Sequence, residues 1–437
     1  MRAMKDSGID WVGIIPDSWQ VVPFRSYAEM RREKNKGEKT RELLALSFAL
    51  GVTLYRDKVY NMDRVKEDYE DYQIVYENDL VLSPNDIIKG SVYVSKYYGC
   101  ISPMYLVFSA RDKKCHHLPY LSYLLRTQEA GRKFFFIARG LIGDILENGK
   151  YVTRRMSVSK QDLLSFKVLL PSFAEQQRIA EFLDRKCAEV DEVIGLQEQI
   201  IEELKAYKQS VITEAVTKGL NPDAPMRDSG IEWIGSIPEH WEVCRMKNVC
   251  TQNPNSLSEK EDKELEFDYV DIGSVSFEKG IFKSEHYAFK DAPSRARRKA
   301  SLGDLIMSTV RTYLRAIDIV NTEEKANYIY STGFAVLTPF DNIKYQYLSY
   351  ISKSLYFLEQ VGILSKGINY PSINSTDLMT ISVALPTLTE QQTIADYLDE
   401  KCADIDSLIQ TKQSKIDSLK EYKKSIIYEY VTGKKEL

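Results

Sequence analysis

The sequence is poor in the residues that enzymes use for catalysis, with only four histidines and six cysteines among 437 residues. It contains no GxxxxGK[ST], GxGxxG, HExxH or GxSxG pattern, so the usual phosphate loop, zinc-binding helix and nucleophile elbow are missing. The two-proline motif of an adenine N6-methyltransferase is missing too. The pair His116-His117 has no cysteine pair near it to complete a zinc site. We therefore predict no catalytic residues, no metal site and no cofactor in this chain.

Long apolar runs are also lacking. No stretch of about 18 apolar residues occurs, which argues against a membrane span, and the start "MRAMKDSGID" has no apolar core of a signal peptide. The six cysteines show no dense spacing pattern, which favours reduced thiols. These features predict a cytoplasmic protein without membrane contact.

Basic charge is not in excess, because the formal net charge is −4. The acidic excess, however, falls in two segments, 172–217 and 386–437, and the remainder of the chain is mildly basic. The total charge thus neither establishes nor excludes binding to nucleic acid.

The sequence does contain a repeat with dissimilar contents. "SGIDWVGIIPDSW" at 7–19 returns as "SGIEWIGSIPEHW" at 229–241, and "PSFAEQQRIAEFLDRKC" at 171–187 returns as "PTLTEQQTIADYLDEKC" at 386–402. Between each opening and ending lie about 150 residues that hardly resemble each other. A shared frame around divergent blocks suggests one scaffold that presents two different binding surfaces.

Both endings predict long helices. Apolar residues recur at spacings of three and four, with Ser172 and Thr387 as N-caps and with Gly219 and Gly433 near the helix ends. Such sustained heptads favour a two-helix coiled coil over two separately buried helices. Polar residues interrupt the repeat at matching places, Lys208 and Lys423 among them, where they can fix the register. The predicted seam residues are Leu183, Val190, Ile194, Ile201, Leu204, Leu398, Ile405, Ile409, Ile416 and Leu419.

The two variable blocks, 20–170 and 242–385, contain short runs rich in Val, Tyr, Ile and Phe between turn residues, followed by a helical stretch and a glycine-containing loop. This order predicts two α+β domains, each built on a sheet. Basic residues gather in loops of both blocks, where Arg and Lys neutralise phosphates and Arg and Asn read base edges. The candidate DNA-binding residues are Arg31, Arg32, Lys34, Arg132, Arg139, Arg154 and Arg155 in the first block, and Arg295, Arg297, Arg298, Lys299, Arg311, Arg315, Lys366 and Asn369 in the second.

The doubled openings, the doubled "P-x-x-x-E-Q-Q-x-I-A" endings, and "STVRTYLR" and "STGFAVLTP" in the second block resemble the specificity (S) subunits of type I restriction-modification systems. The likeness extends over essentially the whole chain. It implies two target-recognition domains, related by a pseudo-twofold axis, each reading one half of a split site in double-stranded DNA. Two long antiparallel coiled-coil helices would join them and set the gap. The implied segments are 1–170 and 221–385 for the recognition domains, and 171–220 and 386–437 for the spacer helices.

The resemblance also implies protein partners. Methyltransferase (M) subunits would dock on the helices and restriction (R) subunits would join the larger complex. S-adenosylmethionine, ATP and Mg would then belong to those partners, and this chain would be a non-catalytic DNA-binding subunit.

Two other functions remain open at this stage. One is a coiled-coil assembly scaffold whose two globular domains bind proteins, and the other is a stand-alone nuclease or methyltransferase with unrecognised motifs. The target sequence, the gap length, the adenines that are methylated and the choice between restriction and modification alone are not readable from the sequence.

Overall fold

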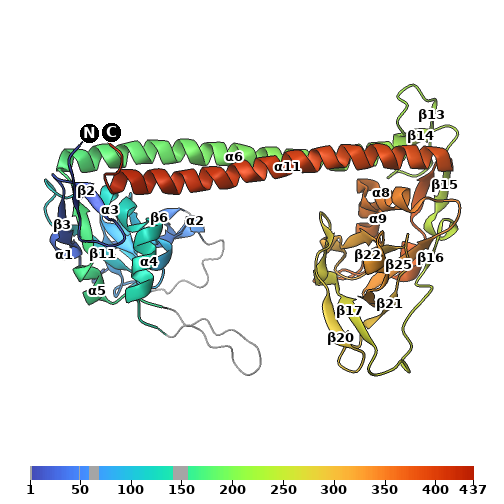
Figure 1. Ribbon diagram of the computed structural model, residues 1–437, viewed down its shortest axis with the longest axis horizontal. Coiled ribbons are helices and arrows are strands. Elements are labelled where there is room, and N and C mark those ends of the chain that lie inside the picture. Colours follow the sequence, from blue (N-terminus) through green and yellow to red (C-terminus); the bar gives the residue numbers. More distant parts are fainter. Residues whose placement is uncertain (1, 49, 59–67, 141–155) are drawn as a thin grey trace. The chain divides into compact units, whose positions relative to one another are not determined.

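The computed structural model describes residues 2–48, 50–58, 68–140 and 156–437, and the chain divides into two compact units. The first unit comprises Met1–Gln197 and Ser414–Leu437, and the second comprises Glu198–Gln413. Each unit therefore combines one variable block with a part of both long helices, α6 (Phe173–Lys218) and α11 (Leu388–Val431) (Figure 1).

The first unit contains many short strands and few helices. Its strands are β1 (Met4–Asp6), β2 (Ile14–Pro16), β3 (Gln20–Pro23), β4 (Ala28–Met30), β5 (Leu44–Ser47), β6 (Gly51–Leu54), β7 (Gln73–Val75), β8 (Leu80–Leu82), β9 (Val92–Val94), β10 (Gly99–Ile101), β11 (Leu106–Ala110) and β12 (Lys167–Leu170). Its shorter helices are α1 (Phe24–Tyr27), α2 (Tyr55–Lys58), η2 (Ile87–Lys89), α3 (Leu118–Leu125), α4 (Gln128–Ile137) and α5 (Lys160–Ser165).

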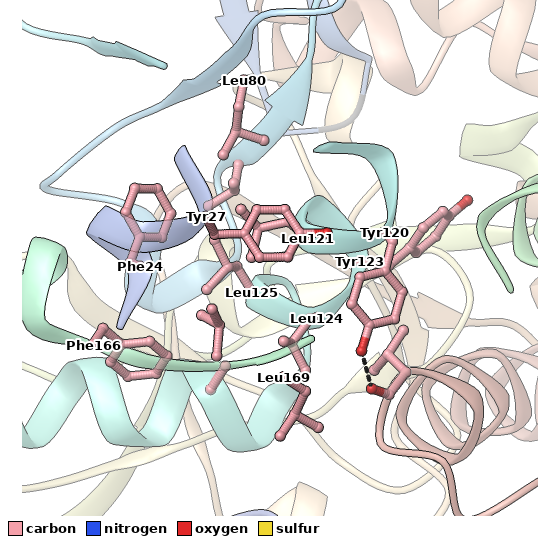
Figure 2. Close-up of a cluster of buried hydrophobic side chains, with 14 of the residues drawn as sticks. Phe24, Tyr27, Leu80, Tyr120, Leu121, Tyr123, Leu124, Leu125, Phe166 and Leu169 are labelled. Atoms are coloured by element: carbon pink, nitrogen blue, oxygen red, sulfur yellow. Dashed lines mark hydrogen bonds between the residues drawn. The ribbon is translucent and has the colours of Figure 1, made fainter. Parts of the chain in front are cut away.

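An antiparallel four-stranded sheet of order β4-β11-β8-β9 forms the centre of this unit. One face carries a core with fully buried Phe24, Phe108, Tyr120 and Phe134, part of which Figure 2 shows. The same core includes Leu183 of α6 and other residues of both long helices. The variable block and the helices thus share one hydrophobic core, which stabilises their mutual position within the unit.

The second unit repeats the opening hairpin and the central sheet. Its strands are β13 (Met226–Asp228), β14 (Ser236–Pro238), β15 (Glu242–Arg245), β16 (Cys250–Gln252), β17 (Glu266–Val270), β18 (Val275–Ser276), β19 (Gly280–Ile281), β20 (Glu285–Ala288), β21 (Ala296–Lys299), β22 (Leu305–Ser308), β23 (Ile317–Ile319), β24 (Ile329–Ser331), β25 (Phe334–Pro339) and β26 (Ser382–Leu385). Its shorter helices are η3 (Met246–Asn248), η4 (Ile272–Ser274), η5 (Thr312–Leu314), α7 (Glu323–Ala326), α8 (Tyr345–Lys353), α9 (Leu355–Leu364) and α10 (Ser375–Leu378).

The second unit's antiparallel sheet has the order β16-β25-β22-β23, which matches the first sheet strand for strand. A further sheet, β20-β17-β24-β21, has one parallel pair and occurs in this unit alone among the described residues. The α+β class predicted from the sequence is confirmed in both blocks.

The long helices pack antiparallel within each unit. In the first unit Phe182 of α6 lies beside Tyr430 of α11, with ring centroids 4.6 Å apart, and Asp191 pairs with Lys423, so one residue number rises as the other falls. In the second unit Lys208 of α6 pairs with Asp406 of α11. The predicted pair of antiparallel helices is confirmed.

Glycine ends both helices for a steric reason. Gly219 has φ +73° and lies against Trp241, and Gly433 has φ +69° and lies against Pro16. A Cβ at Gly433 would come within 2.5 Å of the proline ring, so only glycine allows the helix end to close onto the opening hairpin. No helix in the described part of the chain is long and apolar enough to cross a membrane.

Candidate DNA interface and the frame that carries it

The repeated Glu-Gln-Gln motif fixes each long helix to its block. In the first unit Ser172 caps α6 and forms a reciprocal capping box with Glu175, whose other carboxylate oxygen accepts a hydrogen bond from the indole of Trp19 and pairs with Arg2. Burial raises the pKa of Glu175, but the bonds from Trp19 and Ser172 and the charge of Arg2 outweigh it and lower the pKa overall. Glu175 therefore stays ionised and connects the start of α6 to Trp19 and Arg2 in the N-terminal segment.

The neighbouring glutamine is a fully buried hub. The Gln176 amide oxygen accepts from the Tyr27 hydroxyl and from the backbone N–H of His117, 2.8 Å away. Its amide nitrogen donates to the carbonyl oxygens of Cys115 and Pro171, each at 2.9 Å. The buried amide of Gln176 thus joins the start of α6 to α1, through Tyr27, and to the segment before α3, through Cys115 and His117.

The second unit builds the same anchor with different partners. Glu390 forms the capping box with Thr387 and accepts from Trp241, while Gln391 accepts from the N–H of Lys344 and donates to the carbonyls of Asn342 and Pro386. Because the glutamine bonds main-chain groups, the sequence around it can diverge while the anchor is kept.

All ten predicted seam residues are buried or half-buried. Leu204, Ile409 and Leu419 are half-buried, and the other seven are buried. The two lysines of the interrupted heptads make cross-helix ion pairs, Lys208 with Asp406 at 2.7 Å and Lys423 with Asp191 at 2.6 Å.

Two loops of the second unit are joined at one site. The segment 309–316 bonds to the hairpin 365–373 through Thr312 N–H to the Pro371 carbonyl, through Ile373 N–H to the Thr309 carbonyl, and through the Thr312 and Ser365 hydroxyls at 2.9 Å. We refer to this pair of segments as the loop pair. It brings together Arg311, Arg315, Lys366 and Asn369, which the sequence predicts from two distant stretches, and all four are exposed.

The loop pair holds its arginines in an unusual backbone conformation. Arg311 and Arg315 have φ values of 52° and 49°, and they flank η5 on both sides. Side chains other than glycine rarely adopt this left-handed region, and such strained positions cluster at functional sites. The guanidinium of Arg311 lies over the ring of Tyr370, 5.1 Å from its centroid, and that of Arg315 lies over Phe277. Both cations are thereby supported but remain accessible.

The other cationic candidates of the second unit differ in accessibility. Arg295 and Lys299 are exposed, whereas Arg297 stacks on Phe289 at 5.1 Å. Arg298 is half-buried, its Nε has no hydrogen-bond partner in the described structure, and burial lowers its pKa. Arg298 is therefore less accessible than Arg295 and Lys299.

In the first unit several candidates are already paired. Arg31 donates two hydrogen bonds to the buried Asp79, at 2.6 and 2.8 Å, which raises the pKa of the arginine. Lys34 pairs with Asp71 at 3.0 Å, and Arg139 lies 3.8 Å from Asp162. Arg32 and Arg132 are exposed. Arg154 and Arg155 lie outside the described residues.

Sequence reasoning overlooked two features. A cavity of about 710 Å³ in the first unit is lined by Arg31, Tyr76, Tyr98, Lys113 and His116, among others. Ile368, at the tip of the hairpin 365–373, is fully exposed between polar neighbours. The sequence "SKGINYPS" shows a single isoleucine among polar residues, but only the structure shows that its side chain is exposed. The described residues hold no group of three or more His, Cys, Asp or Glu side chains placed to bind a metal ion.

Two sheet domains, each anchored to the long helices by the same Glu-Gln-Gln motif, define a repeated architecture with dissimilar outer loops. The family model for the type I restriction modification DNA specificity domain matches residues 19–206 and again 238–421. The chain therefore belongs to the family of type I restriction-modification specificity subunits, the non-catalytic subunits that determine DNA target recognition.

Individual proteins agree with this assignment. The chain is 25% identical over 433 residues to the MjaVIII type I restriction enzyme specificity subunit of Methanocaldococcus jannaschii, covering 96% of this chain and 93% of that relative. The HsdS subunit of Thermoanaerobacter tengcongensis has a similar fold, with a TM-score of 0.51, 16% identity and coverage of 96% and 98%. A chain solved in work on complex assembly and conformational transition of the type I R-M system has a TM-score of 0.69, 17% identity and coverage of 95% and 98%.

Proposed function

We propose that this chain reads a bipartite site in double-stranded DNA, one half with each block, while its two long helices set the gap and dock methyltransferase subunits. The recognition domains would be 1–170 and 221–385, and the spacer helices 171–220 and 386–437. Restriction subunits would join the larger complex, and S-adenosylmethionine, ATP and Mg would be bound by the partner subunits.

The observation that carries this proposal is that one frame supports two different surfaces. The anchors of Gln176 and Gln391 are equivalent, as are the ion pairs of Lys423 and Lys208. The surfaces differ, because only the second unit adds the sheet β20-β17-β24-β21 in the described residues. Two unlike readers on a repeated frame suit a target with two unlike halves.

The exposed middle of the helices supports the docking role. Val193 and Leu408 occupy matching positions of the repeat and are 37% and 50% exposed, and Tyr207 and Tyr422, also a matching pair, are 51% and 47% exposed. Repeated apolar side chains that the reader blocks leave uncovered suit two copies of the same partner.

For DNA contact we propose first the exposed candidates that form no ion pair among the described residues. These are Arg32 and Arg132 in the first unit and Arg295, Lys299, Arg311, Arg315, Lys366 and Asn369 in the second. Lys34, Arg139, Arg154, Arg155 and Arg297 stay second-rank proposals. Arg31 is less available for DNA because it is paired with Asp79, and Arg298 is less available because it is half-buried. Contacts to phosphates make such binding salt-dependent, and contacts to base edges make it specific.

The experiment is a methylation assay with the methyltransferase subunits, with and without this chain, followed by mapping of the methylated adenines. We expect methylation at one split sequence that depends on the chain. Methylation of the same sequences in its absence would exclude a specificity role and favour a scaffold that binds only proteins.

A further inference from the structure

We propose that Ile368 is a specificity-determining residue of the second reader, which contacts the C5-methyl group of a thymine in the major groove. This inference rests on the proposed function, because it assigns a base contact to a chain that reads DNA. It adds an apolar contact to a surface that was identified by its charge alone.

The position of Ile368 is unusual for an apolar side chain. It is 100% exposed, so burial in this unit contributes nothing to its presence. Scattered exposed apolar residues are common on protein surfaces, but this one lies at the tip of a hairpin with Lys366, Asn369 and Tyr370 beside it. The isoleucine therefore lies near a lysine, which can bind a phosphate, and next to an asparagine, whose amide can bind a base edge.

The hairpin holds its tip in place. Lys366 and Ser372 exchange two backbone hydrogen bonds of 2.8 and 2.9 Å. Gly367 has φ +110°, and a Cβ there would come within 3.1 Å of the Tyr370 carbonyl oxygen, so the turn requires glycine. A held tip loses little conformational entropy when it binds, which favours a defined contact.

The loop pair supports the hairpin from behind. Ser372 also bridges to Val310, and the guanidinium of Arg311 covers the ring of Tyr370. The Ser365 hydroxyl, which meets Thr312, also donates to the carbonyl of Val361 at the end of α9. The hairpin is therefore connected to α9 and to the segment 309–316, in which Arg311 and Arg315 have positive φ.

The small size of the hairpin favours the wider groove. One bridge, between Lys366 and Ser372, closes the hairpin. The major groove admits even a two-stranded β-ribbon and so has room for it, whereas the minor groove is narrower. The thymine C5-methyl is the apolar group that base edges present in the major groove. A β-branched aliphatic tip between a lysine and an asparagine matches this combination of groups.

The test uses the complete complex with its methyltransferase subunits, after methylation mapping has defined the half-site of the second reader. In duplexes of that target, each thymine of the half-site is replaced singly by deoxyuridine, which removes only the methyl group. Equilibrium dissociation constants are measured at one salt concentration for the unaltered chain, for Ile368→Ala and for the control Ile363→Ala. Ile363 lies in the last turn of α9, is 62% exposed and lies outside the hairpin.

We expect one thymine whose replacement weakens binding of the unaltered chain about fourfold, the effect of burying about one methyl group. Ile368→Ala should weaken binding to the unmodified target by a similar factor and should be insensitive to deoxyuridine at that position. Ile363→Ala should keep the full sensitivity. Because Ile368 makes no buried contact, its replacement is not expected to affect folding.

Two results would overturn the inference: tolerance of deoxyuridine at every position, or additive effects of the two changes. If Ile368→Ala weakens all duplexes equally and reduces DNA bending, the side chain is an inserted wedge and not a reader of thymine. In each case the complex still distinguishes its target, so the proposed function stands. Loss of discrimination between target and random DNA by the unaltered complex would instead refute the proposed function.

Discussion

The two variable blocks of this chain share a four-stranded sheet and an anchor but present different outer surfaces. In the first unit Arg31 is bonded to the buried Asp79. Outside the four-stranded sheet, the strands described in this unit form two-stranded sheets. In the second unit a whole further sheet is present, and Arg311 has no ion pair among the described residues. The comparison shows which parts are constrained by the frame, namely the helix starts and the sheet order, and which parts are free to vary.

The strongest test of this comparison replaces one reader by a copy of the other. Residues 20–170 are exchanged for a second copy of 242–385, which begins and ends at equivalent strands, β3 with β12 and β15 with β26. We expect a chain whose two half-sites are both those of the second reader, as mapped by adenine methylation. A target that keeps the original first half would contradict the assignment of one half to each reader.

The next effect concerns the anchors. Gln176→Met and Gln391→Met should each lower the free energy of unfolding by about 3–4 kcal/mol, since buried main-chain groups lose their partners. Urea unfolding measures this loss. The matched control is Gln177→Met, because Gln177 follows in the same motif and is only half-buried. Equal stability of the control and the two anchor variants would show that the hub is not an anchor.

Arg31 and Arg311 should separate stability from DNA binding. Arg31→Ala leaves the carboxylate of Asp79 buried and unpaired, which should cost about 2–3 kcal/mol of stability. Arg311→Ala should leave unfolding unchanged and weaken binding to the target by about 1–3 kcal/mol. Urea unfolding and a DNA-binding titration on both variants distinguish the two roles, and the reverse pattern would contradict them.

The smallest effect is expected for the cross-helix ion pairs. Lys208→Met and Lys423→Met remove equivalent pairs whose partners Asp406 and Asp191 are more than half exposed. Solvent screening limits each contribution to about 0.5 kcal/mol. The two losses should be similar and should disappear in high salt, as thermal unfolding can measure. A loss several times larger in one unit would show that the frame is less symmetric than its sequence repeat.

Local patterns were sufficient for the frame. Heptad spacing, the caps at Ser172 and Thr387 and the glycines at 219 and 433 are local signals, and the helices begin and end where these signals predict. The repeated motif contains Gln176, but the sequence predicted no structural role for it. Three of its four bonds join the helix start to residues about 60 to 150 positions away, and no local rule reveals such contacts.

The amino-acid sequence was sufficient to predict the fold class and the two long helices, because periodicity, capping and turn chemistry are properties of neighbouring residues, while the family was predicted from the resemblance of the repeated motifs. Which cations are available became clear only from the tertiary structure. Arg31 and Arg311 look equivalent in the sequence, yet one neutralises a buried carboxylate and the other lies on an accessible loop pair. The physical reason is that burial and ion pairing depend on residues brought together from distant parts of the chain.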